Sequence, residues 1–268
     1  MILVTGASGT IGSEVLRQLR AAGQPVRAMS RRLAGDDVVR ADFTDAESLR
    51  KAVDGVDAIF LATAPGGAVA EHDRAMIEAA GARKVVKLSA VGGSVGSPSD
   101  WHAPGERALR DRGAPWVALR PTWFASNALQ WLPAIHAGQP VPNMTGDGRQ
   151  AVIDPRDIAE VAVRALRTEA YDGMALTLTG PEAISVPDMV AVLSEELGRQ
   201  IPIVDVLDPR EPMLAAGVPA DVVEVAVRGY QLVRAGGNEA LSEDVPRVLG
   251  RPARTFREWV ASEWRRAR

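Results

Sequence analysis

The chain has 268 residues, a hydrophobic fraction of 46% and a formal net charge of −3, enough for one large α/β domain with or without a small appendage. With 31 basic and 34 acidic residues, it lacks the strongly basic character of a nucleic-acid-binding protein. The absence of cysteine excludes disulfides, thiolate nucleophiles and cysteine-based metal sites. Its three histidines are scattered along the chain, and we expect no metal site.

The N-terminal residues form an apolar strand pattern rather than a charged and then apolar leader segment. No apolar run in the sequence approaches the length of a membrane span. We therefore expect a cytoplasmic protein that binds neither membrane nor nucleic acid.

Short apolar runs alternate with segments of helical periodicity in the first half of the chain. The pattern predicts strands over residues 1–5, 26–30, 38–41, 58–62, 85–89 and 116–119, and helices over 12–22, 45–53, 71–80 and 106–112. Such alternation is typical of right-handed βαβ crossovers and a parallel sheet. Because the strands are short and apolar, we expect helices on both faces, which makes the fold class α/β with a doubly wound, Rossmann-type sheet.

The pattern changes near residue 120. Residues 121–149 are rich in aromatic residues and proline and predict a helix with loops. Further on, the pattern predicts a strand over 176–179 and helices over 157–166, 186–197, 221–234, 242–249 and 255–266. We therefore expect a Rossmann-like domain over residues 1–155 and a smaller, mainly helical C-terminal subdomain over 156–268 that completes the same compact unit.

A glycine-rich segment joins the first predicted strand to the first helix. Gly6 permits a tight turn, Gly9 removes a side chain where phosphates would lie, and Gly12 lets the helix pack closely on the strand. The N-terminus of the helix offers backbone N–H groups to a pyrophosphate. The alternative is a plain strand-to-helix turn with incidental glycines. We predict dinucleotide binding, and the residues concerned are Gly6, Ser8, Gly9, Thr10, Ile11 and Gly12.

The end of the second predicted strand bears on the choice between NADPH and NADH. NAD-specific sites usually have Asp or Glu there to bind the ribose 2′-hydroxyl, whereas this chain has Ser30, Arg31 and Arg32. Two guanidinium groups suit a 2′-phosphate, so we predict NADPH (NADP+) as the cofactor, the alternative being arginines that simply face water. Asp42 and Phe43 follow the third strand and are expected either to border the adenine or to be a turn residue and a core aromatic.

Five segments together carry the pattern of a known family. They are TGASGTIG at 5–12, LSAVG at 88–92, LRP at 119–121 with Phe124 and Asn127, IDPRDIA at 153–159 and LTGPE at 178–182. In these segments the chain resembles the atypical short-chain dehydrogenase/reductase family, specifically its NmrA-like branch. This branch includes NADPH-dependent quinone and triphenylmethane-dye reductases, and also proteins that bind the nucleotide without known catalysis and act as redox sensors.

The resemblance implies that residues 1–155 bind NAD(P) and that residues 156–268 lie on the substrate side. It places the nicotinamide near the C-terminal ends of the fourth and fifth strands, where open α/β sheets bind ligands. The residues expected along the cofactor there are Ala62, Thr63, Ala64, Ser89 and Ala90.

The chain lacks the catalytic pair of most short-chain reductases, a Tyr whose pKa is lowered by a Lys four residues on. Tyr171 and Tyr230 have no such lysine, and the three lysines all precede the expected position. His102 and Glu106 have the corresponding spacing, in agreement with the NmrA-like branch. We expect His102 either to donate a proton or hydrogen bond to the substrate or to position the loop, and Glu106 to be structural.

Ser89 is a second candidate catalytic residue, expected to bond the substrate carbonyl or the nicotinamide ribose, or else to cap its strand. Arg120 resembles a family position with a structural role. Trp123, Phe124 and Trp131 are expected to line a flat apolar pocket for the substrate, the alternative being plain core packing.

The missing Tyr–Lys pair favours conjugated acceptors. Hydride addition to an isolated ketone makes a strongly basic alkoxide that needs a positioned acid. Addition to a quinone makes a phenolate-like oxygen whose conjugate acid has a pKa of about 10, so slow protonation by water or by a weakly placed imidazole is tolerated. The sequence therefore predicts an NADPH-dependent oxidoreductase, a monomer or homodimer, that transfers a hydride to a quinone, an enone or an aromatic small molecule. The alternative is a non-catalytic NADP(H)-binding redox sensor.

Overall fold

The computed structural model describes residues 1–32, 34–64, 66–92 and 100–265. It divides the chain into two compact units, each formed by two segments. Unit 1 comprises Met1–Pro121 and Pro155–Thr177, and unit 2 comprises Thr122–Asp154 and Leu178–Arg268. This division differs from the expected boundary at residue 155, because the helix after that residue belongs to unit 1 and the segment before it to unit 2.

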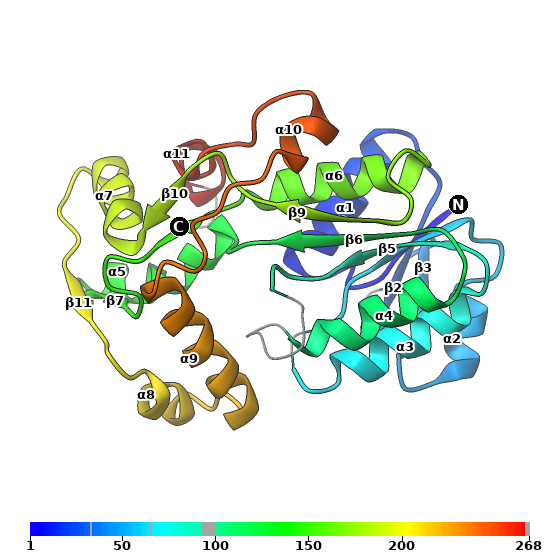
Figure 1. The fold of residues 1–268 in the computed structure, drawn as a ribbon, viewed down its shortest axis with the longest axis horizontal. Coiled ribbons are helices and arrows are strands. Elements are labelled where there is room, and N and C mark those ends of the chain that lie inside the picture. Colours follow the sequence, from blue (N-terminus) through cyan, green and yellow to red (C-terminus); the bar gives the residue numbers. More distant parts are fainter. Residues whose placement is uncertain (33, 65, 93–99, 266–268) are drawn as a thin grey trace. The chain divides into compact units, whose positions relative to one another are not determined.

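Unit 1 is built on a mainly parallel sheet (Figure 1). The strand order is β3-β2-β1-β4-β5-β6-β9, and the five pairs from β3 to β6 are parallel. The chain order reverses between β1 and β4, the position at which doubly wound sheets bind ligands. The predicted fold class is therefore confirmed. The strands are β1 (Ile2–Val4), β2 (Val26–Ser30), β3 (Val38–Arg40), β4 (Ala58–Leu61), β5 (Lys84–Leu88), β6 (Trp116–Pro121) and β9 (Met174–Leu178).

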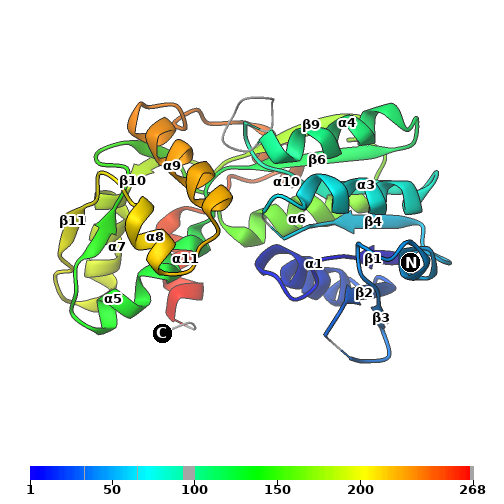
Figure 2. The same ribbon diagram turned by 90° about the horizontal axis from the view of Figure 1, so that it is seen from below.

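Helices cover both faces of this sheet (Figures 1 and 2). Two of them, α1 (Thr10–Ala21) and α6 (Pro155–Arg167), pack together on one face. The other face carries α2 (Ala46–Ala52), α3 (Val69–Ala80) and α4 (Ala103–Asp111). Burial on both sides explains why the strands have nearly continuous apolar sequences. The core beneath α2, α3 and α4 includes the buried residues Leu3, Leu49, Ile59, Met76 and Leu109.

The packing of α6 on α1 explains why the two units are discontinuous in sequence. The amide of Gln18, on α1, donates to the backbone carbonyl of Arg156 at 3.1 Å. The buried residues of α6 are almost all apolar, so this helix completes the sheet-covering layer of unit 1 rather than beginning the C-terminal subdomain.

Unit 2 contains more strand than the mainly helical subdomain that the sequence predicts. In one two-stranded sheet β10 (Ala183–Ser185) pairs antiparallel with β8 (Arg149–Ala151). In the other, β11 (Ile203–Asp205) pairs parallel with β7 (Val141–Asn143). Each of these strands has only three residues, too few to produce a recognisable alternation in the sequence.

The helices of unit 2 agree more closely with the sequence pattern. The helix α7 (Val186–Leu197) has the bounds that the sequence predicts; Ser185 and Asp188 form a capping box at its start, and Gly198 ends it with φ +63°. The helix expected over 255–266 begins after Thr255, and its last residue lies outside the described residues. The helical segments are η2 (Ala125–Trp131), α5 (Leu132–His136), α7 (Val186–Leu197), α8 (Arg210–Ala215), α9 (Ala220–Arg234), α10 (Asp244–Leu249), α11 (Phe256–Trp259) and the π-helical turn η3 (Val260–Trp264).

Two features are absent from the part of the chain that the structure describes: a helix that could span a membrane and a group of three metal ligands. None of its helices has both the length and the apolar character needed to cross a membrane. None of its groups of histidine and carboxylate side chains could hold a metal ion with three or more ligands.

Candidate active site

The glycine loop between β1 and α1 is shaped by two tight contacts. A Cβ atom on Gly12 would lie 2.1 Å from the carbonyl oxygen of Gly6, and one on Gly6 would lie 3.0 Å from that of Ala62. Gly6 also has φ +59°, a conformation that side chains disfavour. These two glycines therefore allow the loop to fold back on itself beside β4.

Gly9 has a different place in the loop. Its N–H donates to the carbonyl of Gly6 at 2.8 Å, and Gly9 is the N-cap of α1 with extended backbone. Within the described residues no side chain caps this helix, and Ser8, Gly9 and Thr10 are exposed. The first-turn N–H groups of α1 are thus available to an anion at the positive end of the helix, and the loop fits the pyrophosphate of a dinucleotide. Ile11 packs its side chain in the core, so only its backbone is available.

The end of β2 carries two exposed arginines, Arg31 and Arg32. The backbone N–H of Arg32 donates to Ser30 Oγ at 3.1 Å. Arg31 Nη1 lies 3.7 Å from Asp42 Oδ2, so the structure brings a carboxylate near the cationic group that sequence reasoning assigned to a 2′-phosphate. Hydrogen bonds from the backbone and hydroxyl of Thr44 hold the pKa of Asp42 below its usual value.

Phe43 is half-buried and stacks on His72 of α3, with ring centroids 5.1 Å apart and an interplanar angle of 18°. One face of its ring is therefore occupied by the imidazole. Both interpretations left open by the sequence, contact with adenine and core packing, are compatible with this position.

The ends of β4 and β5 hold the residues expected along the nicotinamide. Thr5 ties β1 to β4, because its hydroxyl donates to the carbonyl of Ala62 at 3.0 Å and accepts from its N–H at 2.8 Å. Ala62 and Ser89 are buried, Thr63 and Ala90 half-buried, and Ala64 exposed. The loop after each strand therefore runs from the core toward solvent.

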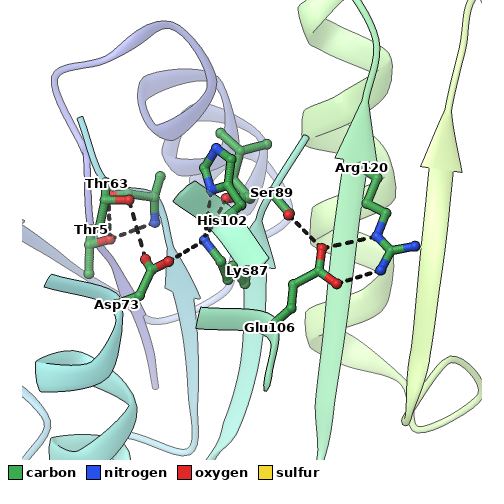
Figure 3. A network of polar contacts seen from close by, with 10 residues as sticks. Thr5, Thr63, Asp73, Lys87, Ser89, His102, Glu106 and Arg120 are labelled. Carbon is green, nitrogen blue, oxygen red and sulfur yellow. Dashed lines mark hydrogen bonds and ion pairs between the residues drawn. The ribbon is translucent and has the colours of Figure 1, made fainter. Parts of the chain in front are cut away.

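A chain of polar side chains lies beside these strand ends (Figure 3). Lys87 on β5 and Asp73 on α3 are both fully buried, and Lys87 Nζ lies 2.7 Å from Asp73 Oδ2. The same Nζ lies 3.2 Å from His102 Nδ1 and donates to the carbonyl of Leu88 at 3.2 Å. Thr63 donates to the other carboxylate oxygen of Asp73 at 3.3 Å. These polar contacts thus connect the loop after β4 to the half-buried imidazole of His102.

The environment of His102 determines its protonation. Burial and the neighbouring ammonium of Lys87 lower the pKa of His102 to about 3, and the charge of Glu106 only partly opposes them. The imidazole is therefore neutral at neutral pH. Because an ammonium group has no acceptor, Nδ1 accepts from Lys87 and the ring hydrogen lies on Nε2. Of the roles considered for His102, this arrangement favours hydrogen-bond donation to a substrate over acid catalysis by an imidazolium.

Ser89 belongs to a second cluster with Glu106 and Arg120, shown in Figure 3. Ser89 Oγ donates to Glu106 Oε1 at 2.6 Å, and Arg120 binds the same carboxylate through Nε at 2.9 Å and Nη2 at 2.5 Å. Although burial raises it, hydrogen bonds from Arg120 and Ser89 lower the pKa of Glu106 overall. Glu106 is therefore a carboxylate that holds the Ser89 proton, and Ser89 retains only its capacity to accept a hydrogen bond.

The residues expected to bind the substrate lie in unit 2. Trp123 stacks on Trp131, with ring centroids 6.0 Å apart. Trp131 is only 4% exposed and belongs to the core of unit 2, whereas Trp123 and Phe124 are half-buried. The burial of Trp131 agrees with the core-packing alternative, and surface for a ligand remains on the other two aromatic residues.

Sequence reasoning missed Lys87 and Asp73. The lysines were set aside because none follows a tyrosine, yet β5 carries Lys87 in a strand that is otherwise apolar at its centre. A lysine in a strand covered on both faces needs a partner, and this requirement was the available signal. A Cβ on Gly105 would lie 2.2 Å from Asp73 Oδ2, so this glycine makes room for the carboxylate.

Sequence comparisons relate the chain to an NAD(P)H-binding family and to reductases. A family model described as NAD(P)H-binding matches residues 6–169. A (4-alkanoyl-5-oxo-2,5-dihydrofuran-3-yl)methyl phosphate reductase from Streptomyces griseus is 38% identical over 97% of both chains. An NAD(P)H azoreductase from Xenophilus azovorans is 32% identical over 97% of this chain and 96% of its own.

Solved structures give the same fold. The NADPH-dependent quinone oxidoreductase from Escherichia coli, complexed with NADPH, has a TM-score of 0.86 and 26% identity, covering 98% of this chain and all of the other. The Citrobacter sp. triphenylmethane reductase complexed with NADP(H) has a TM-score of 0.82 and 23% identity, covering 96% of this chain and 97% of the other. The second likeness concerns the fold alone.

Proposed function

Because the chain belongs to the NAD(P)H-binding family, among the atypical short-chain reductases, and is an NAD(P)H-dependent oxidoreductase, we propose that it uses NADPH to reduce a conjugated small molecule. An enone or a quinone fits best. The observation that carries this proposal is the Lys87–His102 contact of 3.2 Å, which supplies a neutral hydrogen-bond donor where most short-chain reductases have a tyrosine acid.

The preference for NADPH rests on the end of β2. Arg31 and Arg32 are exposed there, and two guanidinium groups suit a doubly charged phosphate better than a ribose hydroxyl. Asp42 Oδ2 lies 3.7 Å from Arg31 Nη1, whereas Asp42 Oδ1 accepts both hydrogen bonds from Thr44. The loop around Gly6, Gly9 and Gly12 would hold the pyrophosphate. When bound, NADPH supplies a hydride, which with one proton from water converts an enone to a saturated ketone or a quinone to a hydroquinone.

His102 would act on the acceptor's carbonyl oxygen. As hydride arrives, negative charge develops on that oxygen, and an N–H donor fixed in advance stabilises it. A neutral imidazole is a very weak acid and does not give up its Nε2 proton to the product. An oxygen anion whose conjugate acid has a pKa of about 10 can take its proton from water, whereas the far more basic alkoxide from an isolated ketone needs an acid during the reaction.

The names of three relatives support a conjugated acceptor. The Streptomyces relative is named for a 4-alkanoyl-5-oxo-2,5-dihydrofuran, in which the ring double bond is conjugated with carbonyl groups. Others are named for azo compounds and quinones. These compounds share an electron-poor π system that leaves the added charge delocalised. The same names favour catalysis over a purely sensory role.

Matched pairs of substrates test this proposal. NADPH oxidation would be followed with an acyl-substituted dihydrofuranone, with simple cyclic enones and quinones, and with the saturated ketone of each enone. We expect turnover of the conjugated compounds and at least about a hundredfold lower kcat/KM for the saturated ketones, the contribution typical of a positioned acid. Equal rates within each pair would contradict the acceptor class, and no turnover with tight NADPH binding would favour the redox sensor.

A further inference from the structure

We infer that Lys87 and Asp73 are positioning residues that hold the His102 ring in one orientation and one tautomer, with its hydrogen on Nε2. Neither residue is assigned a contact with substrate or cofactor. The role of this tautomer in catalysis rests on the proposed function. The presence of the tautomer in the folded protein does not. Three observations support the inference.

The first is the coordination of the Lys87 ammonium. Nζ forms an ion pair with Asp73 Oδ2 at 2.7 Å and hydrogen bonds with the Leu88 carbonyl and with His102 Nδ1, each at 3.2 Å. An ammonium has three N–H groups and no acceptor. A hydrogen on Nδ1 would face another donor and leave one Lys87 N–H unsatisfied in a fully buried position. The arrangement is therefore matched to a ring that is unprotonated at Nδ1.

The second observation is the counterion. Asp73 is fully buried beside Lys87, and its other carboxylate oxygen accepts from Thr63 at 3.3 Å. Without this carboxylate, a buried amine would tend to lose its proton and could then accept a hydrogen from Nδ1. Asp73 thus supplies the counterion that a buried ammonium needs. The other titratable groups around this cluster are Glu106 of α4, which favours protonation of His102, and His72, which precedes Asp73 on α3.

The third observation is that the pair is a poor choice for stability alone. Burying two charges costs desolvation energy, and apolar residues of similar volume often stabilise a protein equally well. In addition, α4 must have a glycine at position 105 to admit Asp73, since a Cβ there would approach Oδ2 to 2.2 Å. The neighbouring strand residues Val85 and Val86 are wholly apolar and buried. A role in fixing the histidine accounts for retaining the pair in such a site.

The test is nitrogen NMR of the full-length protein labelled with 15N-histidine. In the unmodified protein we expect the His102 signals of a neutral ring with a protonated Nε2 and an unprotonated Nδ1 across neutral pH. Signals of the opposite tautomer, or of a protonated ring, would overturn the inference. This measurement requires neither a variant nor an active substrate, so a failure of the proposed acceptor class would not affect its outcome.

Variants test whether Lys87 is the cause. Lys87→Met alone would leave Asp73 buried and unpaired, so the variant to compare is Asp73→Asn/Lys87→Met, which removes both charges together. Asp172→Asn/Lys84→Met is the matched control, because Lys84 is also on β5, is largely buried and pairs with Asp172, away from His102. We expect the double variant to show a fraction of the Nδ1-protonated tautomer and to titrate at a higher pH than the unmodified protein.

Kinetics of the same variants complete the test. We expect kcat of the double variant to fall about tenfold, while the KM for NADPH stays within about twofold. Loss of a complete oxyanion donor lowers kcat by a factor of about 10²–10³, and the double variant would lose only part of this contribution. The control Asp172→Asn/Lys84→Met should retain the native tautomer and kcat. A folded double variant with the native His102 tautomer and the native His102 titration would overturn the inference. Equal changes of the His102 signals in the double variant and in the control would also overturn it.

Discussion

Lys87 Nζ lies 3.2 Å from His102 Nδ1, although the two residues are 15 positions apart in the chain. Lys87 is brought to this place by β5 and His102 by the short turn η1 (Asp100–His102) that precedes α4. A lysine beside the candidate catalytic group is thus retained in a chain without the Tyr–Lys pair. Here the partner of the lysine is an imidazole. The lysine is placed by a strand, whereas the lysine of the Tyr–Lys pair is placed one helical turn after the tyrosine.

Removing the imidazole should affect turnover far more than cofactor binding. We predict that His102→Ala lowers kcat with a conjugated acceptor by about a hundredfold, because the donor to the developing anion is lost. The Kd for NADPH should change by less than about threefold, since the pyrophosphate and ribose sites are distant in sequence and built from other residues. Steady-state kinetics together with NADPH fluorescence titration would check both. An unchanged kcat would show that His102 has only a structural role.

The pH dependence of activity should show no titration of His102 near neutrality. With a pKa of about 3, the ring stays neutral from pH 5 to pH 9 in the ordinary assay range, so kcat should be flat with respect to this group. If an imidazolium were the acid, kcat would instead fall as pH rises through the pKa of the ring. The kcat–pH profile of the unmodified protein, compared with that of His102→Ala, distinguishes the two.

The same depressed pKa predicts a loss of stability in acid. The unfolded chain binds a proton at His102 below about pH 6.5, while the folded chain resists it until about pH 3. Between these values the free energy of unfolding should fall as pH decreases, by about 1.4 kcal/mol per pH unit from this residue. Urea unfolding of the unmodified protein and of His102→Asn, measured from pH 7 to pH 4, should show a shallower slope in the variant. Parallel slopes would contradict the buried, neutral ring.

The glycine loop offers a pair of substitutions that separate folding from binding. Gly12→Ala places a Cβ about 2.1 Å from the Gly6 carbonyl oxygen, so we predict a large loss of stability or failure to fold. At Gly9 the corresponding distance is 3.3 Å and the backbone is extended, so Gly9→Ala should fold. It should nevertheless lose at least about tenfold in NADPH affinity by crowding the phosphates. Thermal unfolding and NADPH titration of both variants would check this, and the reverse order of stability would contradict the loop geometry.

Cofactor choice should depend on Arg31 and on its neighbour Asp42. Arg31→Asp should weaken NADPH binding far more than NADH binding, because it replaces a phosphate partner by a repelling charge. Asp42→Asn should do the opposite and tighten NADPH binding by at most about fivefold, as expected for loss of an exposed ion pair at 3.7 Å. The ratio of Kd values for the two nucleotides is the measurement. Equal losses for both nucleotides in Arg31→Asp would show that this residue does not read the 2′-phosphate.

Much of unit 1 could be predicted because its signals are local. The strand β2 has the predicted bounds, and the glycines of the loop before α1 act through their own backbone. The apolar runs of a two-sided sheet and the periodicity of its helices are likewise contained in short windows of sequence. The cofactor loop is also predictable from a short stretch of sequence, since Gly6, Gly9 and Gly12 come from one segment.

The rest depends on contacts between distant segments. The pairing of Lys87 with Asp73 and His102 joins β5, α3 and η1, and no single window contains all three residues. The three-residue strands of unit 2, such as β7 and β11, are defined only by their partner strands. The assignment of α6 to unit 1 follows from its packing on α1, a relationship that the order of elements along the chain does not reveal.

Isotope transfer tests the central claim most directly. The protein would be incubated with NADPH carrying deuterium at the transferred position of nicotinamide C4 and with an acyl-substituted dihydrofuranone, and the product would be analysed by mass spectrometry and NMR. We predict one deuterium per product molecule, on the ring carbon β to the carbonyls, and hydrogen from water on the α carbon. Reduction with no deuterium in the product, or with deuterium on a carbonyl carbon, would contradict it.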